Sequence, residues 1–245
     1  EWYRRRMTGV TVRRALTLRT KAIFVESLAN PGGVISDMEA LAAVGREAGI
    51  PLIVDNTLAS PWLCRPIEWG ADLVLHSTTK FLSGNGTAMG GAVIDSGRFD
   101  WTAAGERFRG LSEPEPAYHG LAFHETFGDL AFTTHAHAVG LRDLGATMAP
   151  LHAFLTLLGT ETLALRMQRH CENAMKVARF LAAHEEVAWV SYAGLPESPY
   201  HALAQKYLPR GAGSVFTFGL KGGYAAGVRL VEKVNLFSHL ANVGD

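Results

Sequence analysis

The sequence is poor in cysteine and in charge. Its 245 residues include only two cysteines, Cys64 and Cys171, which lie far apart and form no CxxC pair. This spacing excludes a disulfide framework and a zinc site built on cysteine pairs, so we expect both thiols to be buried or inert. Charged residues make up 19% of the chain, and 23 basic residues balance 23 acidic ones. A net charge of zero provides no long-range attraction to nucleic acid or to an acidic membrane.

Long apolar runs are also missing. A membrane-spanning helix needs about 20 consecutive apolar residues, and no such stretch occurs. The N-terminus lacks the charged and then apolar segments of a secretion signal. The densest basic run, Arg4-Arg5-Arg6, is too short for a nucleic-acid-binding stripe, and we expect it on the solvated surface. These absences predict a protein of a reducing compartment, the cytoplasm, that binds neither nucleic acid nor membrane.

The sequence does contain short apolar segments separated by turn residues. Residues 22–27, 51–55, 72–76 and 88–94 are typical of buried strands, and a glycine-rich turn at Gly84 and Gly86 precedes the last of them. A helix is predicted between the first two strands, with a capping box that starts at Ser36 and an end at Gly49. This alternation predicts an α/β fold in which helices cover a mostly parallel sheet.

The second half of the chain predicts a smaller unit. Residues 150–183 fit one long helix or a kinked pair of helices, and strands are predicted at 187–192 and 214–220 before a helix at 224–237. Residues 100–145 are aromatic and rich in histidine, and they follow no clear period. We predict a large domain over residues 1–155 and a small α+β domain over residues 156–245.

Polar side chains follow the predicted strands at the ends where open α/β sheets bind ligands. They are Asn30, Asp55 and the segment from Ser77 to Lys80. A lysine amine forms a Schiff base with an aldehyde cofactor, and nearby hydroxyl groups can bind a phosphate. A carboxylate that ends an apolar strand is costly unless a positive group, such as a protonated pyridine nitrogen, meets it. Taken singly, each residue is also typical of an ordinary turn or surface loop.

The order and flanks of these residues carry more information than any one of them. The segments Glu26-Ser-Leu-Ala-Asn30-Pro31, Val54-Asp55-Asn56-Thr57 and His76-Ser77-Thr78-Thr79-Lys80-Phe81 resemble the Cys/Met-metabolism family of pyridoxal-phosphate enzymes, which has fold type I. The resemblance implies pyridoxal 5'-phosphate as the cofactor and Lys80 as its covalent anchor and catalytic base. It also implies a partner for each part of the cofactor: Asp55 for the ring nitrogen, Asn30 for the phenolic oxygen, and Ser77 and Thr79 for the phosphate.

Later segments resemble one branch of the family, the sulfhydrylases that act on O-acetylhomoserine. They are Pro116-Ala-Tyr-His-Gly120, Phe123, Phe127-Gly128, Leu141-Arg-Asp143, Pro150, Gly159 and Glu161-Thr-Leu163. The implied reaction is γ-replacement, in which O-acetylhomoserine and sulfide give homocysteine and acetate for methionine biosynthesis. Cystathionine γ-synthase and methionine or cystathionine γ-lyase share the cofactor motifs and stay open as alternatives. A catalytically silent fragment or subunit is an alternative of another class.

The resemblance also implies what lies around these motifs. We expect the chain to be truncated at both ends, without the family's ring-stacking aromatic residue and without the arginine that binds the substrate carboxylate. The family builds its sites between subunits, which implies a homo-oligomer, a dimer of dimers. His119, His124, His135 and His137 match no common ligand spacing, so no metal site is expected.

Overall fold

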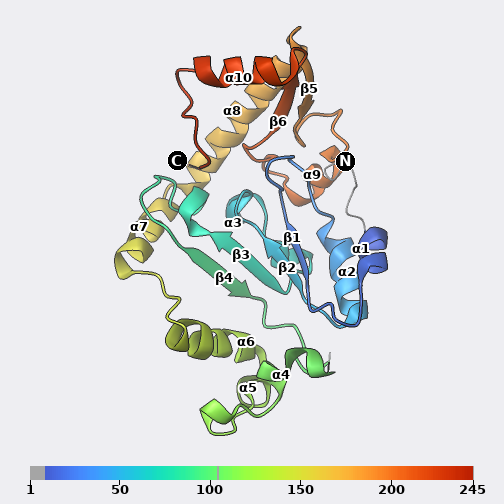
Figure 1. Cartoon of the computed structure of the whole chain (residues 1–245), viewed down its shortest axis with the longest axis vertical. Coiled ribbons are helices and arrows are strands. Elements are labelled where there is room, and N and C mark those ends of the chain that lie inside the picture. The colour runs from blue at the N-terminus through green and yellow to red at the C-terminus, as the bar shows by residue number, and fades with distance from the viewer. Residues whose placement is uncertain (1–8, 104, 245) are drawn as a thin grey trace.

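The computed structural model describes residues 9–103 and 105–244 (Figure 1). The run Arg4-Arg5-Arg6, predicted to be exposed, lies outside the described residues. The helices are α1 (Gly9–Ala15), α2 (Met38–Ala48), α3 (Ser60–Leu63), α4 (Arg109–Ser112), α5 (Phe123–Phe127), α6 (Ala131–His135), α7 (Pro150–Thr160), α8 (Leu163–Ala183), α9 (His201–Tyr207) and α10 (Gly223–Lys233). The strands are β1 (Ile23–Glu26), β2 (Leu52–Asp55), β3 (Leu73–Ser77), β4 (Gly91–Asp95), β5 (Val187–Ser191) and β6 (Thr217–Leu220).

The central sheet has the strand order β1-β2-β3-β4. The first three strands are parallel and β4 is antiparallel to β3, so the mostly parallel sheet predicted from the sequence is confirmed. Glu26 pairs with Asp55 at the ends of β1 and β2, and Ser77 ends β3 opposite Gly91. The carboxyl ends of the three parallel strands therefore lie along one edge of the sheet. The candidate site residues were chosen on the expectation that these ends lie together.

The start of α2 differs from the prediction. Asp37, one residue after Ser36, is the N-cap, and its carboxylate accepts a hydrogen bond from the N–H group of Ala40. The Ser36 hydroxyl donates instead to the carbonyl oxygen of Glu26 at 2.7 Å, which ties the entry of α2 to the end of β1. The predicted capping box at Ser36 is therefore wrong, because a tertiary contact takes its hydroxyl. The predicted end at Gly49 is confirmed, with φ of 61° in the left-handed region.

The long apolar stretch before residue 183 forms the kinked pair α7 and α8. In Figure 1, α8 runs from the central sheet towards the β5–β6 sheet, against which α10 packs. β5 and β6 are antiparallel. The predicted boundary between residues 155 and 156 falls inside α7, and the division into two domains stays a prediction.

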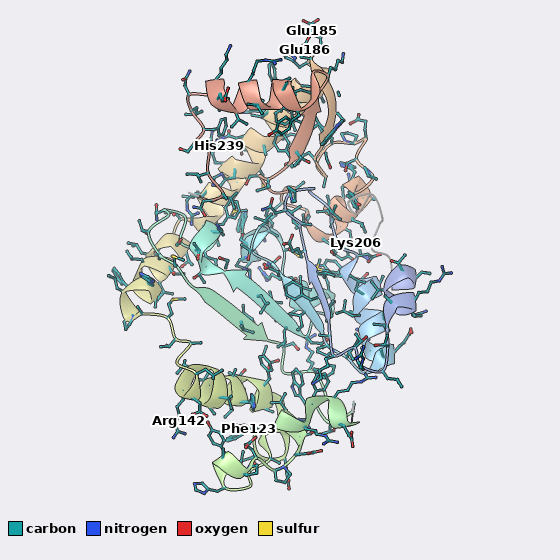
Figure 2. All side chains as sticks on the ribbon, viewed as in Figure 1. Phe123, Arg142, Glu185, Glu186, Lys206 and His239 are labelled. Atoms are coloured by element: carbon teal, nitrogen blue, oxygen red, sulfur yellow. The ribbon has the colours of Figure 1, made fainter. Side chains whose placement is uncertain are left out.

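The histidine-rich segment forms short helices around a second apolar cluster. Helices α4 to α6 are each four or five residues long, too short to show a helical period in the sequence. Phe123 is only 1% exposed at the centre of this region, in the lower part of Figure 2. The buried members of the cluster are Leu73, Trp101, Leu111, Phe123 and Ala131. Since Leu73 belongs to β3, the cluster packs these helices against the sheet.

Both cysteines are free and buried, as the sequence predicted. Burial raises the pKa of Cys64 to about 12, so its thiol stays protonated and unreactive at neutral pH. Among the described helices, none combines the length and the apolar character that crossing a bilayer requires. In the described ranges, no three His, Cys, Asp or Glu side chains are grouped so that they could hold a metal ion.

Candidate active site

A cavity of about 380 Å³ lies at the carboxyl edge of the parallel strands. Four of the five predicted site residues line it: Asn30, Asp55, Ser77 and Lys80. Asp55 and Ser77 end β2 and β3, and Asn30 and Lys80 follow β1 and β3, so the parallel register brings them together across 50 residues of sequence. Another part of the lining comes from far along the chain, residues 240–243.

Lys80 lies on a π-helical turn, Thr78–Leu82, directly after β3. Its backbone dihedrals, φ −92° and ψ −126°, depart from helical values, so the turn bends at the lysine. The half-buried side chain reaches the cavity, where Nζ donates a hydrogen bond to Oδ1 of Asn242. The amine therefore stands at the cavity wall with its nitrogen in contact with a neutral acceptor.

Hydrogen bonds through Thr57 connect the end of β2 to the end of β3. Oδ1 of Asp55 accepts the N–H of Thr57 at 2.9 Å, and the Thr57 hydroxyl accepts the N–H of Ser77 at 2.8 Å. An ionised carboxylate has about four lone-pair sites, so Asp55 keeps acceptor capacity for a cationic group in the cavity. Thr57 also lines the cavity and fixes the spacing between Asp55 and Ser77.

Asn30 lies at the exposed side of the cavity. Its backbone N–H donates to Oε2 of Glu26 at 2.8 Å, so the last side chain of β1 fixes the turn that carries Asn30. Glu26 lines the cavity as well. This hydrogen bond fixes the backbone of Asn30 and so keeps its side chain at the edge of the cavity.

Thr79 is the one predicted site residue that is not part of the cavity lining. Its hydroxyl accepts the N–H of Gly90 at 3.1 Å and lies 3.4 Å from the Gly90 carbonyl oxygen. The N–H of Thr78 also donates to that carbonyl at 2.9 Å. These bonds attach the lysine-bearing turn to the segment before β4, and the predicted contact of Thr79 with a phosphate stays a prediction.

His76 is buried on β3, and the charge of Asp55 acts on it. Burial lowers the pKa of His76, an effect that the negative charge of Asp55 only partly opposes. His76 is therefore neutral at pH 7 and does not supply the positive charge that would balance Asp55. A cationic group bound in the cavity would supply that charge.

Helices α7 and α8 support the turn that carries Lys80. Arg166 of α8 donates to the carbonyl oxygens of Phe81 at 2.8 Å and of Gly159 at 2.7 Å. A Cβ atom at Gly159 would lie 2.1 Å from the carbonyl oxygen of Ser83, closer than any side chain can approach. The backbone around Lys80 is thus held by close contacts from a part of the chain about 80 residues away.

The comparison with protein-family models decides what this arrangement belongs to. The model described as "Cys/Met metabolism PLP-dependent enzyme" matches residues 6–245. The chain belongs to this family. Its match to O-acetyl-L-homoserine sulfhydrylase 1 of Thermus thermophilus is 50% identical and covers 93% of the chain and 54% of that protein. Its match to homocysteine synthase of Schizosaccharomyces pombe is 48% identical and covers 92% of the chain and 53% of that protein.

A solved structure gives the same result for the fold. A Campylobacter jejuni chain named as an O-acetylhomoserine (thiol)-lyase superposes with a TM-score of 0.91 at 39% identity, over 96% of the chain and 58% of that protein. That crystal contains a lysine joined to pyridoxyl monophosphate. The predicted fold type I is thereby confirmed. The chain spans about half the length of the curated relatives it matches.

The residues present fit the family's cofactor. Pyridoxal phosphate requires a primary amine for its aldehyde and an anion for its ring nitrogen. Lys80 and Asp55 provide these groups on one cavity wall, and no neighbouring histidine neutralises Asp55, since His76 is uncharged. Ser77 lines the same cavity, and its hydroxyl is of a kind that can bind an anionic phosphate.

Sequence reasoning missed two members of the site and undervalued a third. Glu26 and Asn242 line the cavity, and Thr57 bridges two strand ends. The position of Thr57 two residues after Asp55 was a usable signal, because a hydroxyl there can reach the next strand. Asn242 is 162 residues from Lys80, and no local sequence pattern predicts the contact between them.

Proposed function

We propose that this chain carries the pyridoxal-phosphate site of an enzyme that performs γ-replacement on an O-acylhomoserine. The reaction proposed is that of O-acetylhomoserine and hydrogen sulfide to give homocysteine and acetic acid. The observation that carries the proposal is the Lys80 amine and the Asp55 carboxylate on one cavity wall, in a chain of this family. The names of the relatives, which are sulfhydrylases and homocysteine synthases, support the choice of substrate.

Each site residue has a proposed task. Lys80 would hold the cofactor through Nζ, and as a free amine Nζ would take the proton from the substrate α-carbon. Asp55 keeps the ring nitrogen protonated, Asn30 donates to the phenolic oxygen, and Ser77 and Thr79 bind the phosphate. When bound, the cofactor withdraws electrons from the substrate carbons and so makes their protons removable.

The overall change exchanges one bond at the γ-carbon of the substrate. The C–O bond to the acetyl ester breaks and acetate leaves, while the sulfur of hydrogen sulfide forms the new C–S bond and its proton balances the acetate. Lys80 lies at the cavity, and its amine is the proposed base that moves protons between the α-carbon and its neighbour. The cavity, about 380 Å³, has the size of a small-molecule site.

The anchor is tested by reduction with borohydride in the presence of pyridoxal phosphate, followed by peptide mass spectrometry. We expect the pyridoxyl group on the peptide that contains Lys80, and its loss in Lys80→Ala. Lys176, an exposed lysine of α8, provides the matched control, because Lys176→Ala should keep the label. Labelling of other lysines with none on Lys80 would refute the site.

The substrate is tested by product analysis with two thiols. Purified protein receives O-acetylhomoserine with either sulfide or cysteine, and the products are separated. Preferential formation of homocysteine supports the sulfhydrylase reaction, whereas cystathionine identifies a cystathionine γ-synthase. Release of a 2-oxo acid without a thiol identifies a γ-lyase, and no turnover with cofactor bound to Lys80 identifies a silent subunit.

We further propose that the protein is a homo-oligomer, a dimer of dimers. One face of α7 is apolar and exposed: Leu151, Phe154, Leu157 and Leu158 are each between 56% and 66% exposed. Contiguous apolar surface of this kind marks interaction sites, and the proposed partner is a second copy of the chain. Light scattering should give four chains per particle, and Phe154→Glu should lower that number.

Because both cysteines are free, we propose a reducing compartment, the cytoplasm.

A further inference from the structure

The last segment of the described chain closes the side of the cavity opposite the sheet. Residues 240–243 line the cavity although they lie beyond α10, at least 160 positions from Lys80. In Figure 1 this segment returns from α10 at the top of the molecule to the level of the central sheet. Its described residues meet the lysine-bearing turn through a side chain and through the backbone.

The side-chain contact involves the reactive atom. Oδ1 of Asn242 accepts a hydrogen bond from Nζ of Lys80, and both side chains are half-buried. A lysine side chain has four rotatable bonds and loses considerable freedom when it is held in place. The amide oxygen holds the nitrogen at the cavity wall through this one accepted hydrogen bond.

The backbone contact sets where Asn242 stands. Gly244 has φ of 93°, and a Cβ atom there would lie 2.7 Å from the backbone nitrogen of Phe81 and 3.0 Å from the carbonyl carbon of Lys80. Between the two contacts, Val243 packs against the main apolar core. The segment is therefore fixed against the peptide bond that follows Lys80, and this position places Asn242 at the amine.

We propose that Asn242 is a positioning residue for Lys80, whose amine it holds at the cavity wall whenever that amine is free. The proposal rests on the proposed function of Lys80 as cofactor anchor and base. The contact requires an N–H on Nζ, so it is made before the cofactor is captured and again after the substrate displaces the lysine. Asn242 thus reduces the number of conformations that the Lys80 side chain samples before its amine meets the cofactor or the substrate proton.

The test compares two near-isosteric substitutions in the purified protein. Asn242→Leu removes the acceptor and keeps the volume, whereas Asn242→Asp keeps an acceptor oxygen in place. Ser238→Ala, at an exposed position of the same loop, is the control. The measurement is the rate at which protein stripped of cofactor captures added pyridoxal phosphate on Lys80, trapped with borohydride and counted by mass spectrometry, together with total bound cofactor.

We expect Asn242→Leu to capture the cofactor between about three and ten times more slowly, the rate equivalent of the rotamer freedom of one long side chain. Total bound cofactor should be unchanged, Asn242→Asp should stay within about twofold of wild type, and kcat of Asn242→Leu should fall more than KM rises. Gly244→Ala should slow capture as well, because its Cβ displaces the segment.

The outcomes separate this inference from the function on which it rests. If wild type captures no cofactor on Lys80, the proposed function fails. If wild type captures it and Asn242→Leu does so at the same rate, the positioning role is refuted while the function stands. Equal slowing in Asn242→Leu and Asn242→Asp would also refute it, since the loss would then come from the loop and not from the acceptor.

Discussion

Replacing Arg166 by methionine should weaken both the fold and the capture of the cofactor. The Arg166 guanidinium donates to the carbonyl oxygens of Phe81 and Gly159 at 2.8 and 2.7 Å, and to the hydroxyl of Thr162 at 3.0 Å. Burial lowers the pKa of Arg166, yet an arginine stays charged at neutral pH. Methionine keeps much of the apolar stem and removes every donor.

The expected size of the effect follows from these bonds. A hydrogen bond to a charged group contributes about 1.5–3 kcal/mol when buried. The carbonyl oxygen of Phe81 loses the guanidinium donor, whereas that of Gly159 keeps the N–H of Thr162 at 3.4 Å. Because the side chain is only partly buried, water replaces part of the loss, and we expect a net decrease in the free energy of unfolding of about 2 kcal/mol. For a chain of this size that decrease lowers the melting temperature by about 4–8 °C.

The assay is thermal unfolding of Arg166→Met beside a control on the same helix. Arg169 is 71% exposed and pairs with Glu172, so Arg169→Met should cost at most about 0.5 kcal/mol. Borohydride trapping should also show slower labelling of Lys80 in Arg166→Met, because the turn loses its support. Equal melting temperatures for the two variants would refute the reasoning.

Three further predictions concern other contacts. Gly159→Ala should destabilise the protein by about 3 kcal/mol, since its Cβ would overlap the backbone of the lysine-bearing turn, whereas Gly227→Ala on α10 has open space and should not lower the melting temperature. Tyr207→Phe should cost about 1.5 kcal/mol in urea unfolding, because the hydroxyl that joins α9 to the Asp37 carboxylate at the start of α2 is lost; an unchanged midpoint would contradict this. Burial lowers the pKa of His76 below its ordinary 6.5, so the folded state binds this proton less tightly than the unfolded state. Stability should therefore fall as the pH drops below about 6.5, and His76→Gln should flatten the decline in unfolding midpoint between about pH 6.5 and 5; a decline as steep as in wild type would exclude His76 as its source.

The sequence predicted those parts of the site that depend on strand ends. Asp55 ends one apolar strand and Lys80 follows another, and parallel pairing brings such strand ends to one edge of the sheet. Thr79 shows that being next to a site residue in the sequence does not determine where a side chain points. It precedes Lys80 directly, yet the π-helical turn directs its hydroxyl to Gly90 and not to the cavity wall.

Contacts between distant segments were beyond sequence reasoning. Arg166 lies 85 residues from Phe81, and Asn242 lies 162 residues from Lys80. An arginine on a helix and an asparagine in a loop are ordinary surface residues until tertiary packing assigns them a partner. The direction of β4 was hidden for a similar reason, because an apolar run has the same composition in a parallel and in an antiparallel strand.

Around Lys80 the structure holds the backbone firmly and the side-chain nitrogen only loosely. Reversible covalent attachment requires an amine that can leave the cofactor and return to it, so the lysine side chain has to stay mobile while its backbone is fixed. That backbone is fixed by the hydrogen bond between Thr79 and Gly90, the residue before β4, and by the bond from Arg166 of α8 to Phe81, and Gly244 packs against the next peptide bond. The amine itself donates one hydrogen bond to a neutral partner, Asn242. Substitutions of the backbone supports should therefore lower stability and capture together, whereas Asn242→Leu should slow capture at nearly unchanged stability. Loss of stability in Asn242→Leu equal to that in Arg166→Met would contradict this division.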